Sequence, residues 1–431
     1  MLRVALTTLG CKVNRADGLA LLARLGEGFR VVGFEAEADV YIVNTCTVTA
    51  TADRQSRQLL YRARRRNPSA RVVLTGCFAR VSPEEAARIP VVDRVFSLGQ
   101  HPVLLAFLEE LRGSMTLPAP ERGSGHPAAE GVPAAGAPAR ARPCLKVQDG
   151  CNAACSYCIV PRARGPSRSV PEEVVVEALH RLAEQDPGEV VLSGIHLGAY
   201  GRDLDPPTTL VRLIRRCASA GPRLRLSSVD PQEVDPELRS LLEGEAALCP
   251  HLHLPIQSGA DEVLAAMNRP YRSDEIRGLL EELRQRRAEL ALGADLIAGF
   301  PGETEAQAAA SVALVEASPL THLHVFPFSP RPGTPASARA DQLPRELARA
   351  RAAALRQAGR RKLLAFAAAQ LGQVRDVLVE STDGDAGRGR GLSDNYLRVA
   401  LRGLSPGQRS GARLRVLIED QDGSTLRGRP A

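Results

Sequence analysis

Strand-like and helix-like runs alternate six times between residues 142 and 369, and this repeat limits the possible folds more than any other feature of the chain. Repeated strand–helix units form a parallel sheet with helical crossovers, and six in a row curve into part of a barrel. In such barrels the reacting groups lie at the carboxyl ends of the strands. We therefore predict a partial (βα)6 barrel, with strands at 144–147, 189–193, 223–228, 251–256, 293–298 and 322–327.

The segments on either side of this barrel predict two further domains. Residues 1–112 alternate strand-like runs at 2–8, 39–43 and 71–75 with helical runs, which is typical of a doubly wound α/β domain. After a long basic helical run at 344–370, residues 370–431 have short strand-like runs and glycine-rich turns, which predict a small β-barrel. Residues 113–141 are rich in Gly, Ala, Pro and Ser, lack periodicity, and are predicted to be a flexible linker. The fold class is therefore α/β, with 142–369 as the core domain.

Composition and charge narrow the class of protein. The chain has 56 basic and 49 acidic residues, a net charge of +7, which suits a polyanionic partner without requiring one. It has nine cysteines in 431 residues, and a long chain of this kind uses them for metal binding in a reducing compartment rather than for a disulfide framework. We expect the first eleven residues to be a buried strand rather than a secretion signal. Because about 18 consecutive apolar residues are needed to span a membrane and no such run occurs, we expect no membrane span and a cytoplasmic location.

Three cysteines follow the first barrel strand with the spacing C-x3-C-x2-C, namely Cys151, Cys155 and Cys158. Thiolates are the usual ligands of iron–sulfur clusters. Three ligands can hold three irons of a four-iron cluster, so that the fourth iron keeps an open position for a substrate or cofactor. A zinc knuckle that lacks its fourth ligand is the alternative, but this spacing at the end of a first barrel strand is specific.

A second group of cysteines lies in the N-terminal segment: Cys11 in TTLGCKVN, Cys46 in VNTCTVT and Cys77 in LTGCFAR. Each comes directly after a strand-like run. In a doubly wound sheet such positions converge at one edge, where the binding crevice lies. Buried core cysteines are the alternative, although core packing does not explain why all three occupy the same point of a strand–loop unit. The remaining three, Cys144, Cys217 and Cys249, are interpreted as packing residues.

The motif around Cys151, Cys155 and Cys158, GCNAACSYCIVPRARG, resembles the radical-SAM signature, in which S-adenosylmethionine (SAM) chelates the open iron. The resemblance assigns Tyr157 to the aromatic position near the adenine of SAM. The segment VVLSGIHLGAYG resembles the one that contacts the methionyl amine of SAM, which implicates Ser193 and Gly194. The segment ADLIAGFPGETE resembles a later SAM-contact segment, which implicates Gly299.

The three N-terminal motifs resemble those of the methylthiotransferase family of radical-SAM enzymes, and this resemblance covers essentially the whole chain. It implies two 4Fe-4S clusters, one that chelates SAM and an auxiliary one at Cys11, Cys46 and Cys77, together with a C-terminal TRAM-like RNA-binding domain at 370–431. It also implies the reaction: a 5′-deoxyadenosyl radical removes hydrogen from a C–H bond, and sulfur methylated by a second SAM is delivered from the auxiliary cluster. No side chain is expected to act as acid or base, since the chemistry takes place on the clusters.

The sequence motifs TLGCKVNRAD and NTCTVTATADRQSRQ most resemble those of the branch that acts on N6-threonylcarbamoyladenosine at position 37 of tRNA, next to the anticodon. The alternatives are the branches that modify isopentenyladenosine of tRNA or an aspartate of a ribosomal protein. A third reading, an RNA-binding protein with structural clusters, leaves the open iron unexplained. The partners implied are the anticodon stem-loop of tRNA and a low-potential electron donor such as flavodoxin or ferredoxin; the sequence does not indicate an oligomeric state.

Two basic runs could neutralise phosphates or be solvated helix faces. One comprises seven arginines between Arg54 and Arg71 without an acidic residue, and the other runs from Arg339 to Lys362 with eight basic and two acidic residues. In the tail, Tyr396 could stack on a base or belong to the barrel core. The pairs His251 with His253 and His322 with His324 could bind a metal ion, because alternate strand residues share a face, but the resemblance favours interior lining.

Overall fold

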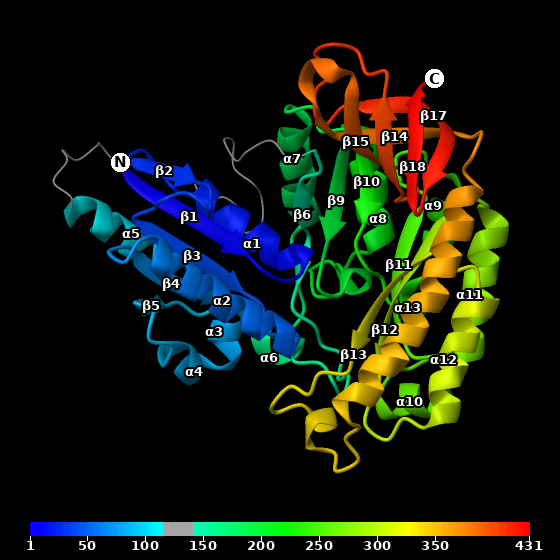
Figure 1. Cartoon of the computed structure of the whole chain (residues 1–431), viewed down its shortest axis with the longest axis horizontal. Helices are drawn as coiled ribbons and strands as arrows, with labels where there is room; N and C mark the ends of the chain where they lie inside the picture. The colour runs from blue at the N-terminus through cyan, green and yellow to red at the C-terminus, as the bar shows by residue number, and fades with distance from the viewer. Residues whose placement is uncertain (115–140) are drawn as a thin grey trace.

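The computed structural model describes residues 1–114 and 141–431, so most of the predicted linker at 113–141 lies outside the described residues. Three groups of elements stand side by side in Figure 1: an N-terminal parallel sheet, a central barrel and a C-terminal barrel. Within the described ranges, none of the helices combines the length and the hydropathy that crossing a bilayer requires.

The N-terminal sheet has five parallel strands in the order β2-β1-β3-β4-β5, with helices on both faces. All six residues of the central strand β3 are buried, which fits the apolar run at residues 40–43. One hydrophobic core lies under α2 and the other under α1 and α5, as expected for a doubly wound sheet. The elements are β1 (Leu2–Thr8), α1 (Lys12–Ala23), β2 (Phe29–Val32), β3 (Val40–Thr45), α2 (Ala50–Arg66), β4 (Arg71–Gly76), α3 (Cys77–Val81), α4 (Pro83–Ala87), β5 (Arg94–Val95) and α5 (His101–Ser114).

The central barrel is an arc of six parallel strands in chain order. The sheets β6-β9-β10 and β11-β12-β13 are joined by the parallel bridges Leu224 to Leu248 and Ser228 to His253. Each end strand, β6 and β13, has a paired neighbour on one side only, so the arc is open between them, which confirms a partial (βα)6 barrel. Its strands are β6 (Cys144–Lys146), β9 (Glu189–Ser193), β10 (Arg223–Leu226), β11 (His251–Gln257), β12 (Ala291–Ala298) and β13 (His322–Pro327).

Helices cover the outer face of this arc (Figure 1). The main ones are α7 (Glu172–Ala183), α8 (Leu210–Cys217), α9 (Pro236–Gly244), α11 (Ser273–Arg286), α12 (Glu305–Ala317) and α13 (Arg345–Ala368). Shorter elements lie in the loops at the strand ends: β7 (Gln148–Asp149), α6 (Val160–Arg164), β8 (Arg168–Ser169) and α10 (Asp261–Ala266).

Alternation along the strands decides which side chains face the inside of the barrel. Leu252, Leu254 and Leu296 pack into the core formed with the surrounding helices. Because successive strand residues point to opposite faces, the intervening residues line the interior. This confirms that both H-x-H pairs are interior residues; they share this face with Asp295 and Phe326.

The C-terminal barrel is closed, with strand order β14-β15-β16-β18-β17 around a core that includes Val377, Val399 and Ile418. It packs on the amino ends of the central strands. Tyr396, in the turn between β15 and β16, stacks on His251 with ring centroids 4.4 Å apart. Its ring therefore contacts the amino end of the central barrel, which we call the floor, instead of facing RNA. The strands are β14 (Val374–Thr382), β15 (Arg388–Ser393), β16 (Arg398–Arg402), β17 (Arg413–Asp422) and β18 (Thr425–Pro430).

A buried ionic network seals this floor. Glu189 is fully buried and accepts hydrogen bonds from Arg223 at 2.7 Å and from Arg225 at 2.6 Å. Burial alone would raise the pKa of Glu189, but the two guanidinium groups hold it at about 2. Arg225 also donates to the backbone carbonyls of Asp394 and Ser393, and thereby ties the floor to the C-terminal barrel.

Candidate active site

The cysteines of the C-x3-C-x2-C motif lie in one tight loop at the carboxyl end of β6. The backbone N–H of Ala153 donates to the sulfur of Cys151 at 3.3 Å, and that of Cys158 donates to the carbonyl of Cys155 at 3.1 Å. Burial, together with the nearby Cys155 and Cys151, raises the pKa of Cys158 to about 12. A desolvated thiol of this kind becomes a thiolate when a metal binds it, so the loop suits a metal cluster better than free thiols.

A cavity of about 460 Å³ opens beside these thiols and is lined by Cys155, His196, Asp230, Glu233 and Arg269, among others. Arg269 donates to the sulfur of Cys155 at 3.3 Å and to Oδ1 of Asp230 at 2.7 Å. On another side, Nδ1 of His196 lies 3.5 Å from the sulfur of Cys151. The cavity therefore offers cationic and anionic groups within reach of the same loop.

Unsatisfied acceptors in this cavity fit a ligand with hydroxyl or ammonium donors. Both carboxylate oxygens of Glu233 are buried and accept no well-aligned hydrogen bond from the residues described, although His196 and Arg202 each come within 3.0 Å of one of them. Buried polar atoms are almost always paired, so a bound molecule is the natural partner. SAM carries an amino group and ribose hydroxyls, and the residues present fit it.

Sequence reasoning missed the residues His196, Asp230, Glu233 and Arg269. They come from loops after different strands and meet only in the folded chain. The signal available was position: His196 follows the end of β9, and Asp230 and Glu233 follow β10, where barrel chemistry is expected.

The four residues predicted to contact SAM lie around the loop but do not line this cavity, and their roles stay predictions. Tyr157 packs with Phe300 and Phe328. Ser193 is buried at the end of β9, and the N–H of Gly194 donates to Oγ of Ser227 at 3.3 Å. Gly299 has a φ of +77°, and a side chain there would collide with Ala348 of α13, which by itself explains the glycine.

The other cysteine triplet lies at the carboxyl edge of the N-terminal sheet, after the adjacent strands β1, β3 and β4. Cys11 is exposed, whereas Cys46 and Cys77 are buried. Burial raises the pKa of Cys77 to about 12, while Arg164 lowers it and the neighbouring Cys11 and Cys46 raise it. The structure therefore brings these three residues together, as the position of each after a strand predicted.

Glycine allows the close approach at this edge. Gly10, with a φ of +92°, lies so near Cys46 that a side chain on Gly10 would come within 2.7 Å of the sulfur. Only glycine adopts this backbone conformation at low cost and leaves that space free.

Arg164 links the two triplets. It ends α6, six residues after Cys158, and its side chain is 1% exposed. It donates to Oδ2 of Asp17 at 3.0 Å and to Oδ1 of Asn14 at 3.2 Å, both on the helix that follows Cys11. Lys146 of β6 pairs with the same Asp17 at 2.5 Å, so a buried network fixes the loop of one triplet against the other.

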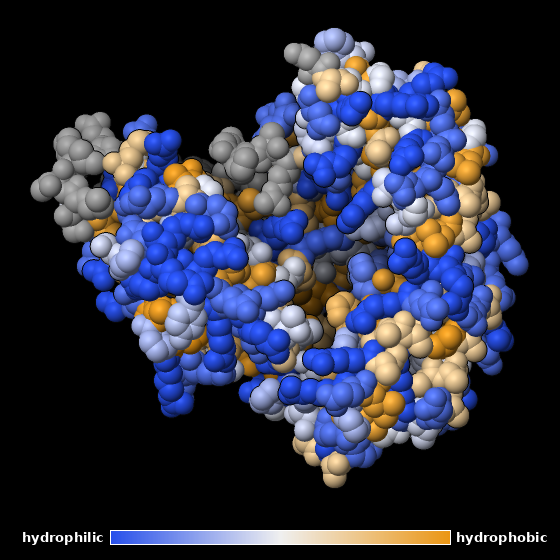
Figure 2. Space-filling model, in the orientation of Figure 1, coloured by the Kyte–Doolittle hydropathy of each residue, from blue (hydrophilic) through white to orange (hydrophobic). Residues whose placement is uncertain are grey.

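A second contact joins the N-terminal sheet to the opposite edge of the arc. Arg331, in the loop after β13, donates to Asp53 at 2.5 Å and to Oγ1 of Thr47 at 3.3 Å. The N–H of Ala50 donates to Oγ of Ser329 at 3.0 Å. The N-terminal sheet thus stands beside the open side of the barrel, and Figure 2 shows the surface hollowed between the two.

The spacing of the cysteines is wrong for a single ion. Four ligands at about 2.3 Å from one zinc lie within about 4 Å of one another. Among the residues described, the groups of three potential ligands whose donor atoms all lie within 4.8 Å of one another contain no cysteine. All nine cysteines are free, so each triplet suits a larger cluster rather than a disulfide or a zinc knuckle.

Comparison with known proteins agrees with this geometry. Residues 3–97 match the family described as Uncharacterized protein family UPF0004, and residues 145–315 match the Radical SAM superfamily, which implies a 4Fe-4S cluster and SAM. The structure is similar to the radical S-adenosylmethionine methyltransferase TsrM from Kitasatospora setae, with a TM-score of 0.57 and 17% identity over 78% of this chain and 74% of that one. At this identity the likeness shows the fold alone.

Sequence relatives extend over almost the full length. The chain is 36% identical to threonylcarbamoyladenosine tRNA methylthiotransferase MtaB of Aquifex aeolicus (strain VF5), over 97% of this chain and 100% of that protein. It is 34% identical to the protein of the same name in Bacillus subtilis (strain 168), over 94% and 91%. It is 33% identical to tRNA-2-methylthio-N(6)-dimethylallyladenosine synthase of Anaeromyxobacter sp. (strain Fw109-5), over 100% and 95%. The chain therefore belongs to the methylthiotransferase family of radical SAM enzymes, in the branch of the MtaB proteins.

Proposed function

We propose that this enzyme converts N6-threonylcarbamoyladenosine at position 37 of tRNA to its 2-methylthio derivative. The observation that carries the proposal is the convergence of two separate cysteine triplets, at the carboxyl ends of two different sheets, which Arg164 and Asp17 tie together. One sulfur-transfer reaction needs both a radical generator and a sulfur donor, and two neighbouring thiolate groups supply a place for each.

Cys151, Cys155 and Cys158 would hold the cluster that chelates SAM. When bound and reduced, this group supplies the electron that cleaves SAM to a 5′-deoxyadenosyl radical. The chain's own residues orient the ligand: Glu233 offers its buried Oε2 to a donor of SAM, and Asp230 is held in place by Arg269.

Cys11, Cys46 and Cys77 would hold an auxiliary cluster that carries the sulfur. The burial of Cys46 and Cys77 keeps water away from this site, while the exposed Cys11 leaves one side accessible. The charge of Arg164 favours the thiolate form of Cys77, because it lowers the pKa that burial raises.

The walls of the barrel protect the reaction. The floor is closed by Glu189, Arg225 and Tyr396, and the outer face is covered by helices. With the floor and the outer face closed, solvent can reach the interior only through the open edge of the arc, which limits side reactions of a radical. We assign residues 1–112 to the auxiliary-cluster domain, 142–369 to the radical-SAM core and 370–431 to the RNA-binding domain.

The RNA-binding surface is proposed to include the outer face of β15 and β16. Arg388, Arg390 and Arg398 are exposed there and form no ion pair with any residue that the structure describes. In contrast, much of the arginine run in α2 is engaged within the protein, for example Arg64 with Asp93 and Arg66 with Glu35. A flavodoxin or ferredoxin is the proposed electron donor, and the tRNA substrate implies work in the cytoplasm.

The decisive experiment is nucleoside analysis of tRNA from a strain that lacks the gene. Loss of 2-methylthio-N6-threonylcarbamoyladenosine, restored by the wild-type gene but not by a Cys46→Ala gene, is the expected result. If 2-methylthio-N6-threonylcarbamoyladenosine is unchanged and the 2-methylthio isopentenyl nucleoside is lost, the enzyme belongs to the other tRNA branch. Unchanged tRNA nucleosides would refute a tRNA substrate.

A further inference from the structure

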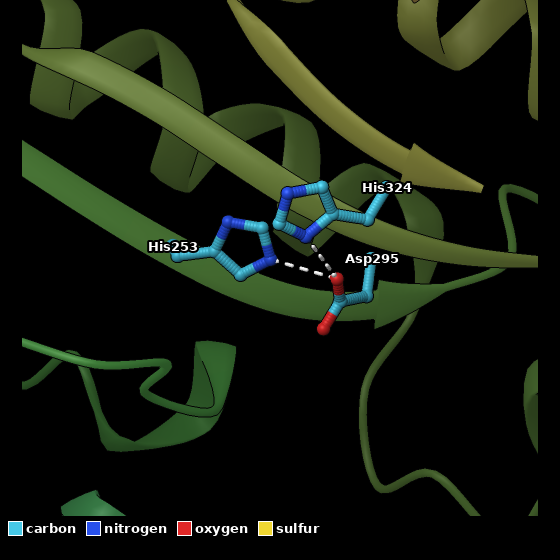
Figure 3. A group of neighbouring side chains, drawn as sticks. All are labelled: His253, Asp295 and His324. Atoms are coloured by element: carbon cyan, nitrogen blue, oxygen red, sulfur yellow. Dashed lines mark hydrogen bonds and ion pairs between the residues drawn. The ribbon is translucent and has the colours of Figure 1, made fainter. Parts of the chain in front are cut away.

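Three polar side chains meet on the inner face of the barrel, one from each of three adjacent strands: His253 of β11, Asp295 of β12 and His324 of β13 (Figure 3). Nε2 of His253 lies 2.9 Å from Oδ1 of Asp295, and Nδ1 of His324 lies 3.1 Å from the same oxygen. The two imidazole rings are 4.8 Å apart. None of the roles assigned above uses these residues, which we call the lumen triad.

The hydrogen bonds fix which atoms of the triad remain free. Burial opposes ionisation of Asp295, but the bonds from His253 and His324 hold its pKa below the usual range, so it is a carboxylate that only accepts. Both nearby ring nitrogens must therefore donate. Nδ1 of His253 is pressed against Gly293, where a side chain would come within 2.5 Å of it. A ligand in the barrel can then reach Nε2 of His324 and Oδ2 of Asp295.

The same hydrogen bonds compete with a bound metal ion. An imidazole coordinates a metal through an unprotonated nitrogen. Here the two nitrogens nearest to the carboxylate lie within hydrogen-bond distance of it, so a metal ion would have to displace both bonds. The triad is arranged to present one carboxylate oxygen and one imidazole nitrogen to a polar organic group.

An exposed aromatic ring lies one step closer to the cysteines. Phe326 is two residues beyond His324 on β13, faces the same side, and is 43% exposed. Its partner across the strands is Ile297, which packs in the cluster that includes Tyr157 of the cysteine loop. Two strand residues span about 7 Å, so the order from the floor upward is triad, aromatic ring, cysteine loop.

We propose that the lumen triad binds the polar N6 substituent of the target adenine, through Nε2 of His324 and Oδ2 of Asp295, while Phe326 stacks on the base. The inference rests on the proposed function and adds the residues that select the substrate. Enzymes that act on a base in this way read its edge by hydrogen bonds and hold its face against aromatic side chains. The hollow in Figure 2, beside the open edge of the arc, is the route by which the base would enter.

Chemistry favours a threonylcarbamoyl group at this position over an isopentenyl group. The threonylcarbamoyl group carries N–H donors for Oδ2 of Asp295 and a hydroxyl whose O–H can donate to Nε2 of His324. The isopentenyl group is a hydrocarbon, and burying it here would strip water from Asp295 without replacing its hydrogen bonds. Sites built to hydrogen-bond a substrate reject analogues that lack the polar group, by factors of about 10⁴ or more.

The test uses the enzyme with its iron–sulfur clusters reconstituted and two anticodon stem-loop RNAs, one with threonylcarbamoyladenosine and one with isopentenyladenosine. The variants are His324→Phe, which keeps a ring but removes both nitrogens, and Asp295→Asn, which keeps the shape. His180→Phe is the matched control, since His180 is exposed on α7 outside the barrel. Measurements are KM and kcat for each RNA, SAM cleavage without RNA, and zinc content.

His324→Phe is expected to raise KM for the threonylcarbamoyl RNA about twofold to tenfold, the range for removal of a hydrogen bond between neutral groups, with SAM cleavage and the cluster spectra unchanged. Asp295→Asn should shift KM in the same direction, and the preference over the isopentenyl RNA should fall in both variants. The control should match wild type.

Two results would overturn this inference while leaving the proposed function intact. One is an unchanged KM in both variants. The other is one equivalent of bound zinc in the wild type that is absent from His324→Phe, which would make the triad a metal site. If the wild type modifies neither threonylcarbamoyl RNA nor tRNA in the cell, the proposed function itself fails, and with it the basis for the triad.

Discussion

The guanidinium of Arg164 donates to Oδ2 of Asp17 across 3.0 Å, and both side chains are almost completely buried. This ion pair connects the helix after the C-x3-C-x2-C loop with the helix after Cys11. The distance between the two proposed clusters is therefore set by a buried contact between two helices.

Replacing Arg164 with Ala should destabilise the folded protein by about 3 kcal/mol, because removing one partner of a buried ion pair leaves the other charge uncompensated. Lys146 remains near Asp17 and keeps the loss from being larger. The measurement is urea unfolding, together with iron analysis after reconstitution. Arg162→Ala is the control, since Arg162 is exposed on the same helix and, among the residues described, donates only to the carbonyl of Pro332. Equal stability of the two variants would show that the network does not hold the units together.

The two cysteine triplets should have separable functions. Cys151→Ala is expected to abolish SAM cleavage, whereas Cys46→Ala should preserve it and stop methylthiolation. Replacing all three cysteines of either triplet should remove about half of the iron and sulfide, as two clusters of one type would require. Cys217→Ala is the control, because Cys217 is buried in the core of the central barrel. Product formation by Cys46→Ala at the wild-type rate would refute the sulfur-donor role.

Acid should weaken the floor of the barrel through two histidines. Burial, with Arg225 nearby, lowers the pKa of His251 well below 6.5, and burial lowers that of His322 to about 4. The unfolded chain takes up protons near pH 6.5 while the folded chain does not, so stability is complete above pH 6.5 and falls as the pH decreases towards 4.

His251→Phe isolates part of this effect. Neither nitrogen of His251 has a hydrogen-bond partner among the residues described, and its ring stacks on Tyr396, which a Phe ring can also do. The variant should match or exceed wild-type stability at pH 7.5 and exceed it by about 2 kcal/mol more at pH 5. The free energy of unfolding, measured in urea at both pH values, gives the answer. If the variant and the wild type differ in free energy of unfolding by the same amount at pH 7.5 and pH 5, the low pKa of His251 is refuted.

The arginines on β15 and β16 should govern tRNA affinity. Replacing Arg388, Arg390 and Arg398 with Ala should weaken binding and lower the slope of log K against log salt by about 0.9 for each phosphate that is no longer neutralised. The matched control is Arg427→Ala, because Arg427 on β18 is already paired with Asp420 and Asp422. Binding of labelled tRNA across a range of salt concentrations measures both quantities. A slope equal to that of the control would exclude this surface.

The strands of the central barrel could be predicted because apolar residues recur in each of them, continuously in β9 and alternating with polar residues in β10, β11 and β13, and because the strands follow at regular intervals. The edge strands β2 and β5 could not be predicted, because they have only four and two residues. Strand β18 lies inside the closed barrel, but it contains both Gly and Pro, which are typical of turns. The closed order of the C-terminal barrel depends on pairings such as Val399 with Leu426, which no local pattern specifies.

In the candidate site, too, local sequence patterns predicted some residues, and others could be found only in the folded structure. Both cysteine triplets followed from position after strands, but the groups around them did not. Arg269 reaches Cys155 from 114 residues away, and Arg164 reaches Asp17 from 147 residues away. The basic run in α2 suggested a phosphate-binding face, yet its acidic partners, such as Glu85 beside Arg57, come from distant segments that only folding brings together.

The stacking of Tyr396 on His251 has a consequence for how this enzyme can be divided. Tyr396 belongs to the last sixty residues of the chain, but its ring closes the amino end of the central barrel. A protein truncated before residue 370 would lack Tyr396, and the amino end of the central barrel would be open. Bulk water could then reach the reactants from that end. The C-terminal barrel, proposed to bind RNA, thus also closes one end of the central barrel.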